Sequence, residues 1–257
     1  MNKKVSLGLY TGRYVSGSAP MNALSLAWAL KNADMWGGTQ WRSSCRVDSN
    51  RNYLIADFLE KSTADYLFII DEDMIHPDAA AVVLANRDLP IVSGLYFHRS
   101  ENGSYAPHFY KEDGVSADER RGHGTAVNNF YRAMTIEVCE KYSELGNLPY
   151  NDGPVILTDK AGKPLDNLLL PIDASGWGCI MLRRDALEAL NPPYLHDEPG
   201  LNGDLAFFKQ VKAKGIPVYG DASVICAHNA DSKIGLAAFH DYVTGIQEAS
   251  NGQDTSK

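Results

Sequence analysis

Hydrophobic residues in the first hundred positions follow two alternating patterns. Three short apolar runs have the length and composition of strands covered on both faces; they are "VSLGLY" (5–10), "YLFII" (66–70) and "PIVSGLYF" (90–97). Three other segments space their apolar residues as one face of a helix; they are "MNALSLAWALKN" (21–32), "RNYLIADFLEKS" (51–62) and "PDAAAVVLANRD" (77–88). This alternation predicts an α/β fold with a mostly parallel central sheet flanked by helices.

The second half of the chain loses this regularity and then regains it. From 99 to 170 the pattern fades, and we expect an insertion there that forms an extra hairpin or a lid. Within it, "YRAMTIEVCEKYSEL" (131–145) fits a helix, or a strand followed by a helix. Beyond it, "GCIMLRRDALEAL" (178–190) predicts a strand that leads into a helix. We therefore predict one domain over 1–245 and a flexible polar tail over 246–257.

The last regular segments are a helix and a strand. "DLAFFKQVKAKG" (204–215) predicts an amphipathic helix stopped by Gly215, and "VYGDASVICAH" (218–228) ends in a strand. Neither segment repeats an earlier one.

Composition narrows the classes of protein to consider. With 257 residues and 44% hydrophobic content the chain can bury a large core, and its net charge of −8 disfavours a surface that coats duplex nucleic acid. There is no apolar run of about eighteen residues and no signal-peptide pattern at the start, so we expect a soluble, cytoplasmic protein. The four cysteines form no CxxC pair, which favours buried free thiols over a zinc ribbon.

Three consecutive acids end the most apolar strand. In an extended chain Asp71 and Asp73 face the same way while Glu72 faces the other way. Two carboxylates at the carboxyl end of a buried strand suit a hard divalent cation that also holds phosphate oxygens. The alternative is a solvated acidic turn at the start of the next helix, where acids are favoured in any case.

The order of several motifs resembles a known family. "RNYLIADFL", "LFIIDEDM", "PIVSGLYFHR", "GWGCIMLRRDALEAL" and "GDLAFFKQVKAKGIPVYGDASVICAH" follow one another as in the glycosyltransferase A fold, especially small bacterial and phage-type nucleotide-sugar transferases. The resemblance spans nearly the whole chain, from Val5 to His228. It implies a single Rossmann-like glycosyltransferase A domain.

The resemblance implies a metal site. Asp71 and Asp73 match the DxD motif, in which the second acid usually binds manganese or magnesium and the first contacts the ribose or the metal. His228 matches a histidine that often completes the coordination. Oxygen with imidazole suits Mn²⁺, whereas Mg²⁺ prefers oxygen alone. The alternative for His228 is a hydrogen-bonded residue at the end of a strand.

The resemblance also implies donor-binding residues. Tyr10, Thr11 and Arg13 follow the first strand where the family binds base and ribose, and Arg51 would lie near the base or the phosphates. Tyr10 fits the core equally well, and Arg51 fits an exposed helix start. Trp177 and Gly178 would lie beside the donor sugar, with a flat indole face and a close backbone approach; alternatively the glycines shape a turn and Trp177 fills the core.

Asp204 matches the acid that deprotonates the acceptor in inverting members of the family. Many relatives carry two acids at this place, whereas here Gly203 precedes Asp204. This departure leaves the catalytic base and the stereochemistry open. The alternative for Asp204 is the N-cap of the helix that follows.

Together these features predict a metal-dependent glycosyltransferase, a hexosyl- or pentosyltransferase. It would move a sugar from a nucleoside diphosphate donor to a hydroxyl of a glycan or a protein. The resemblance implies a UDP-sugar donor, since the family commonly uses one. One alternative is a phage-type DNA glycosyltransferase acting on hydroxymethylated pyrimidines in the host cytoplasm. A second is a non-catalytic nucleotide-sugar binding module. A third, a haloacid dehalogenase-like phosphatase, also places a DxD after a strand but usually on its first one.

Overall fold

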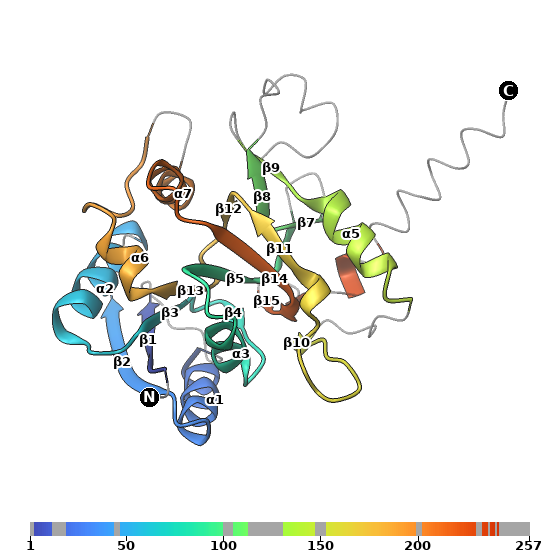
Figure 1. The fold of residues 1–257 in the computed structure, drawn as a ribbon, viewed down its shortest axis with the longest axis horizontal. Helices are drawn as coiled ribbons and strands as arrows, with labels where there is room; N and C mark the ends of the chain where they lie inside the picture. Colours follow the sequence, from blue (N-terminus) through green and yellow to red (C-terminus); the bar gives the residue numbers. More distant parts are fainter. Residues whose placement is uncertain are drawn as a thin grey trace, which may run out of the picture.

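The fold is known from a computed structural model that describes residues 3–11, 19–43, 47–99, 105–112, 131–146, 153–198, 202–229, 233–235, 237–239 and 241. The first half alternates strands and helices as predicted (Figure 1): β1 (Val5–Thr11), α1 (Ala19–Asn32), β2 (Trp36–Ser43), α2 (Val47–Lys61), β3 (Tyr66–Ile70), β4 (Met74–Ile75), α3 (Ala80–Asn86), β5 (Ile91–Leu95) and β6 (Phe97–Arg99). The predicted strands and helices of this half are confirmed. Strand β2 was not predicted, because "WGGTQWRS" has neither an apolar run nor a clear alternation.

The second half contains shorter elements. They are β7 (Tyr105–Pro107), β8 (Phe109–Glu112), β9 (Tyr131–Ala133), α5 (Thr135–Ser143), β10 (Val155–Ile156), the 3-10 helix η1 (Asp166–Leu168), β11 (Leu169–Ile172), β12 (Ala174–Ser175), β13 (Cys179–Arg183), α6 (Arg184–Glu188), α7 (Gly203–Ala213), β14 (Val218–Ile225), β15 (Ala227–Asn229) and β16 (Lys233–Ile234). The irregular region holds a hairpin of β6 and β7, and β9 leads into α5 as a strand followed by a helix. Helix α7 ends before Gly215, whose φ of 67° suits a residue without a side chain.

Within the described ranges, the central sheet has eight strands in the order β10-β14-β5-β13-β3-β1-β2, with β11 also paired to β14. β2, β1 and β3 are parallel neighbours, and β14 is parallel to β5. β13 lies antiparallel between β3 and β5, so those two also share a direction. The predicted α/β class with a mostly parallel sheet flanked by helices is therefore confirmed; the antiparallel β13 was not foreseen.

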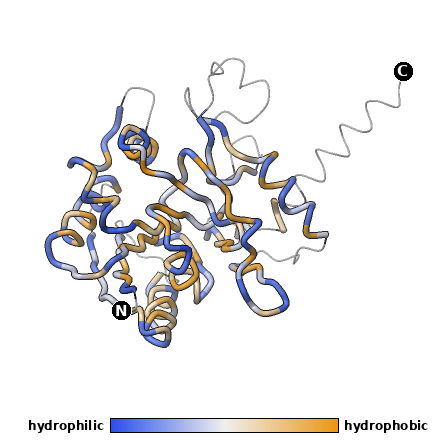
Figure 2. The backbone as a smooth tube through the Cα atoms, in the orientation of Figure 1, coloured by the Kyte–Doolittle hydropathy of each residue, from blue (hydrophilic) through white to orange (hydrophobic). Residues whose placement is uncertain are grey.

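Two hydrophobic cores cover the two faces of the sheet. One joins the sheet to α2, α5, α6 and α7, and the other joins it to α1 and α3. Figure 2 shows the apolar residues concentrated in the central strands and helix faces, and polar residues in the outer loops. Within β13, Ile180 and Leu182 belong to the first core, whereas Cys179 and Met181 belong to the second. This period of two is the signature of a strand buried on both faces.

The topology brings distant segments to one edge of the sheet. The carboxyl ends of β1, β3, β5 and β14 lie there, together with the amino end of antiparallel β13 and the start of α7. Ligands of open α/β sheets bind at this edge. In the part of the chain that the structure describes, no helix combines the length and the apolar character needed to span a bilayer. Arg13, Cys45, His123 and the predicted tail over 246–257 lie outside the described residues.

Candidate active site

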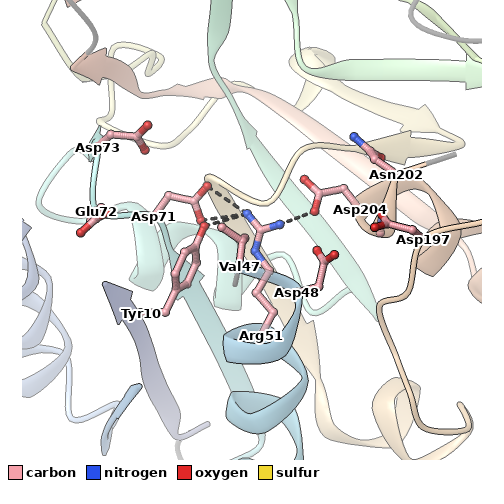
Figure 3. A pocket seen from close by; sticks show the side chains of 11 residues that line it. Tyr10, Val47, Asp48, Arg51, Asp71, Glu72, Asp73, Asp197, Asn202 and Asp204 are labelled. Carbon is pink, nitrogen blue, oxygen red and sulfur yellow. Dashed lines mark hydrogen bonds and ion pairs between the residues drawn. The ribbon is translucent and has the colours of Figure 1, made fainter. Parts of the chain in front are cut away.

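A cavity of about 350 Å³ opens at this edge. Six carboxylates and a single guanidinium, that of Arg51, line it. The acids come from the start of α2, the turn after β3, and the approach to α7: Asp48, Asp71, Glu72, Asp73, Asp197 and Asp204. We call this site the acidic cavity (Figure 3). So many negative charges around one arginine strongly favour a bound cation.

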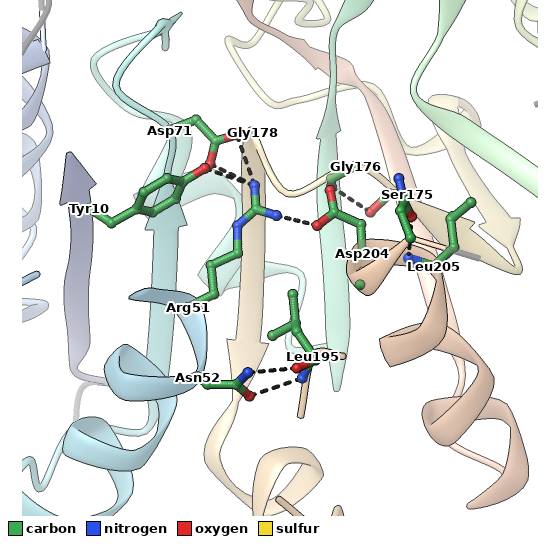
Figure 4. A network of polar contacts seen from close by, with 12 residues as sticks. Tyr10, Arg51, Asn52, Asp71, Ser175, Gly176, Gly178, Leu195, Asp204 and Leu205 are labelled. Carbon is green, nitrogen blue, oxygen red and sulfur yellow. Dashed lines mark hydrogen bonds and ion pairs between the residues drawn. The ribbon is translucent and has the colours of Figure 1, made fainter. Parts of the chain in front are cut away.

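Arg51 connects the two sides of the acidic cavity. Its Nη2 donates to both carboxylate oxygens of Asp71, at 3.0 and 3.2 Å, and its Nη1 is paired with Asp204. Nη2 also donates to the Tyr10 hydroxyl at 2.8 Å (Figure 4). The guanidinium lies over the rings of Tyr10 and Trp177, 5.1 and 5.3 Å from their centres. Arg51 is only 4% exposed, so the alternative of an exposed helix-start residue is wrong.

Helix α2 holds Arg51 in place through the next residue. The side chain of Asn52 donates to the carbonyl of Leu195 at 2.6 Å and accepts from its N–H at 2.9 Å. This pair of bonds ties α2 to the segment that leads toward α7, as Figure 4 shows. The two residues of the "RN" dipeptide therefore have different roles: Arg51 forms ion pairs with two acids, and Asn52 attaches α2 to the segment around Leu195.

Asp71 and Asp73 have separate partners. Asp73 accepts from Nε2 of His228 at 3.0 Å, and this bond lowers the pKa of Asp73 and raises that of His228. Figure 3 shows Glu72 directed away from the carboxylates of Asp71 and Asp73. The predicted extended chain is wrong here, because residues 71–73 form a turn after β3 in which the Met74 N–H donates to the Asp71 carbonyl at 3.3 Å. Among the described residues, only one trio of possible ligands has its ligand atoms within 4.8 Å of one another, and it lies elsewhere. Asp71, Asp73 and His228 are therefore more widely spaced than that.

The donor set nevertheless suits a hard divalent cation. Asp73 and His228 are adjacent, and the Nδ1 atom of His228 is buried without a hydrogen-bond partner. The Asp73 side chain is half exposed, which leaves room for ligands that are not protein groups. A carboxylate and an imidazole with open positions fit Mn²⁺ better than Mg²⁺.

Asp204 lies in the first turn of α7. Burial raises its pKa to about 6; the positive charge of Arg51 opposes this rise, and the negative charges of Asp71 and Asp48 add to it. The N-cap of α7 is Asn202, whose side chain accepts from the N–H of Leu205 at 3.1 Å. The alternative role of Asp204 as the N-cap is therefore wrong. A carboxylate with this pKa, facing a cavity, is suited to general base catalysis.

Asp48 is a site residue that the sequence did not reveal. A side chain at Gly203 would meet the Asp48 carboxylate at 2.7 Å, so Asp48 fills the space beside Asp204. Asp48 lies on α2, far from Gly203 in the sequence, so this contact depends on packing. The local sequence contains no signal for it, since an acid in a helix start is common in any case.

The remaining predicted residues lie as follows. Tyr10 lines the acidic cavity although its ring is almost fully buried. Thr11 is buried and accepts from the Trp41 indole N–H at 3.3 Å, outside the cavity lining. Trp177 is completely buried between Arg51 and Phe207, which supports the alternative that it fills the core. Gly178 donates its N–H to the Tyr96 hydroxyl at 3.1 Å, and a side chain there would collide with that ring.

His98 and His108 form a second group, close to His228. His108 stacks on Tyr96 at 4.2 Å between ring centres and lies 4.6 Å from His98. Burial lowers the pKa values of both His98 and His108, and nearby histidines lower them further. Neutral imidazoles therefore lie close to His228.

Comparisons with known proteins show the fold only. No protein-family model and no curated protein matches the chain. Among solved structures, A197 from STIV aligns over 91% of this chain and 90% of its own, with 17% identity and a TM-score of 0.50. GalNAc-T7 with UDP, GalNAc and Mn²⁺ aligns over 88% of this chain and 43% of its own (10% identity, TM-score 0.47). CMP:2-keto-3-deoxy-manno-octonic acid synthetase with CTP aligns over 96% of this chain and 100% of its own (12% identity, TM-score 0.39). The likeness to A197 establishes a shared fold for nearly the whole chain.

Proposed function

We propose that the chain is a metal-dependent glycosyltransferase that moves a sugar from a nucleoside diphosphate, UDP-sugar in the first instance, to an acceptor hydroxyl. The observation that carries this proposal is the acidic cavity itself, with Asp73 beside His228 on one side and Asp204 on the other. It lies at the ligand-binding edge of the sheet. One cation site and one base, held apart by a buried arginine, are the parts that sugar transfer requires.

Each residue of the acidic cavity has a defined task in this proposal. Asp73 and His228 would hold Mn²⁺, which when bound offsets the charge of the departing diphosphate. Arg51 fixes Asp71 and Asp204 relative to one another and keeps its own charge, because those two acids outweigh the effect of burial on its pKa. Tyr10 lines the acidic cavity together with Asp71.

Asp204 acts on the acceptor. Its carboxylate takes the hydroxyl proton while the acceptor oxygen bonds to the anomeric carbon and the bond from that carbon to the phosphate oxygen breaks. The nucleoside diphosphate then leaves with the bonding pair. With a pKa of about 6, Asp204 is mostly ionised at neutral pH and is a stronger base than an ordinary carboxylate.

The acceptor is best assigned to neutral hydroxyl compounds. The six carboxylates of the acidic cavity repel a polyanion, and Arg51 is fully engaged by Asp71 and Asp204. A glycan or protein hydroxyl therefore fits better than a hydroxymethylated base in DNA. A non-catalytic module would bind the donor and release nothing.

The test begins with binding and continues with turnover. UDP, GDP and CDP are added with and without Mn²⁺, and the melting temperature is measured. We expect UDP with Mn²⁺ to raise it by several degrees, since a ligand at 100 times its Kd adds about 2.7 kcal/mol. UDP-sugars are then incubated with oligosaccharide or with hydroxymethylated DNA, and free UDP is measured. No stabilisation by any nucleotide with metal would overturn the proposal; stabilisation without UDP release would assign a binding module, and transfer to DNA alone would reassign the acceptor.

A further inference from the structure

A second group of potential ligands lies behind the acidic cavity, on the other face of the sheet. His76 follows β4, Cys179 begins β13 and Cys226 follows β14. Their ligand atoms all lie within 4.8 Å of one another, and each residue is at most 1% exposed. We call these three residues the sulfur cluster. Two cysteines and a histidine brought together in a dry core are the donor set of soft metal ions.

The hydrogen bonds of His76 fix the orientation of its ring in the sulfur cluster. Asn22, from α1, donates to the carbonyl of His76 at 3.2 Å and accepts from its N–H at 3.3 Å, which fixes the orientation of the amide. The Asn22 oxygen therefore faces Nδ1 at 2.6 Å, and Nδ1 carries a proton. The other ring nitrogen, Nε2, lies 2.7 Å from the carbonyl oxygen of Gly178.

That second contact is repulsive in a neutral ring. With the proton on Nδ1, both Nε2 and the Gly178 oxygen present lone pairs to one another. The contact becomes favourable when a proton sits at Nε2; a metal ion bound there requires the Gly178 carbonyl to move aside, because 2.7 Å leaves no room for an ion between the two atoms. An imidazole whose Nδ1–H is held by an oxygen acceptor is also how metal-bound histidines are oriented in proteins.

The two sulfurs of the cluster lie together in the dry core, Cys179 at the start of β13 and Cys226 just after β14. Gly94 makes room for the Cys179 sulfur, since a side chain there would meet it at 2.6 Å. A thiolate is the form of cysteine that binds metals.

We propose that His76 through Nε2, Cys179 and Cys226 bind a soft cation, Zn²⁺ or Cu⁺. Two thiolates and a neutral imidazole cancel the charge of Zn²⁺, so the core around the ion stays neutral. Cu⁺ needs no more than these three ligands, whereas Zn²⁺ takes a fourth, for which the Gly178 carbonyl oxygen has to move from its 2.7 Å contact with Nε2. With no access from solvent, the ion is enclosed as the chain folds and stabilises the contact of β4, β13 and β14.

This assignment differs from a plain hydrogen-bonded cluster. If Nε2 carries only a proton, His76 is an imidazolium beside the Cys179 thiolate, and Cys226 adds a weak S–H hydrogen bond. A metal ion uses both sulfurs as thiolates. The two arrangements therefore differ in metal content and in the charge of Cys226.

The test measures metal in the folded protein. The chain is purified under reducing conditions, washed with EDTA to strip exposed sites, and its zinc and copper are measured by elemental analysis. We expect one equivalent of zinc or copper per chain in the wild type, in Cys139→Ser and in Asp73→Ala. Cys179→Ser and Cys226→Ser should lose it. Cys139 is a matched control because it is a free cysteine outside the cluster; Asp73→Ala removes a ligand of the acidic cavity only.

A second measurement covers variants that fail to fold. Wild-type protein is unfolded with chelator and refolded with Co²⁺ in place of the native ion. We expect a thiolate-to-cobalt charge-transfer band that Cys139→Ser retains, and a higher melting temperature after refolding with Zn²⁺ than without it. Folded wild-type protein that contains neither metal and gives no cobalt band would overturn the proposal and assign the imidazolium–thiolate pair.

Discussion

The acidic cavity and the sulfur cluster share one segment of chain and have opposite chemistry. Residues 71–76 supply Asp71 and Asp73 to the cavity and His76 to the cluster, which Cys179 and Cys226 complete. The cavity is open to solvent and lined by oxygen, whereas the cluster is closed and lined by sulfur and nitrogen. Solvent access decides the difference, because hydrated oxygen ligands exchange ions and buried thiolates retain them.

The two regions also treat charge differently. In the acidic cavity negative charge is in excess and Arg51 is shared between two acids, so a bound cation is expected to exchange with each turnover. In the sulfur cluster positive and negative charges are matched in a dry core, as a permanent structural site requires. Substitutions in the acidic cavity should therefore lower the rate of transfer, and substitutions in the sulfur cluster should lower the free energy of unfolding.

The largest expected effect is on the metal side of the acidic cavity. Asp73→Asn should lower transfer about 1,000-fold, since loss of metal charge stabilisation costs several kcal/mol and each 1.36 kcal/mol is tenfold. The melting temperature should hardly change, because Asp73 is half exposed and follows a strand. The measurement is UDP release with saturating Mn²⁺. Glu60→Gln, an exposed acid on α2, is the control and should keep wild-type activity; activity of Asp73→Asn within tenfold of wild type would contradict the assignment.

The next effect concerns Arg51, the residue that spans the acidic cavity. Arg51→Ala leaves Asp71 and Asp204 facing one another without their shared partner, and should cost about 3 kcal/mol of unfolding free energy. Arg42→Ala is the matched control, because Arg42 pairs with Asp57 near the surface and should cost less than about 1 kcal/mol. Urea unfolding of both variants gives the comparison. Equal costs would show that the bridge is no stronger than a surface pair.

The sequence predicted the acidic cavity better than the sulfur cluster, for a physical reason. Asp71, Asp73 and Arg51 follow local rules, because the end of the apolar run of β3 places the two acids and the helical pattern of α2 places the arginine. His76, Cys179 and Cys226 come together only through the sheet order, in which antiparallel β13 is inserted between β3 and β5. Nothing in the local pattern of "GCIMLRR" distinguishes an antiparallel insertion from another parallel strand.

Within the cavity the sequence missed what depends on packing. Trp177 was predicted to lie beside the donor sugar, yet it is buried in the core, where Arg51 and Phe207 pack against its ring. Asp48 was not predicted as a site residue, because it lies beside Asp204 only through the packing of α2 against Gly203. Strand β2 went unpredicted because an edge strand with half-buried residues has no continuous apolar run.

A smaller effect distinguishes the asparagines that support the two regions. Asn22→Ala removes three hydrogen bonds from His76 in the core and should cost about 3 kcal/mol, because buried polar groups lose their partners. Asn202→Ala removes one exposed helix cap at the rim of the cavity and should cost about 1 kcal/mol. Thermal or urea unfolding of the pair measures the difference of about 2 kcal/mol. If both variants lose the same stability, the core role of Asn22 is not supported.

The smallest effect is a shift in pH dependence that tests Asp204 as the base. Its pKa of about 6 predicts that transfer falls about tenfold per pH unit below that value, because a base must be ionised to accept the acceptor's proton. The charge of Asp48 raises this pKa, with Asp71 acting in the same direction and Arg51 against it. Asp48→Asn removes one of the raising charges, so the acidic limb should move to lower pH by less than about one unit. Profiles of kcat/KM from pH 4.5 to 8 for the wild type and Asp48→Asn measure the shift, with Glu60→Gln as a charge-matched control that leaves the limb in place. A limb that stays fixed in Asp48→Asn, or moves to higher pH, would assign the titration to another group and remove the reason to place the base at Asp204.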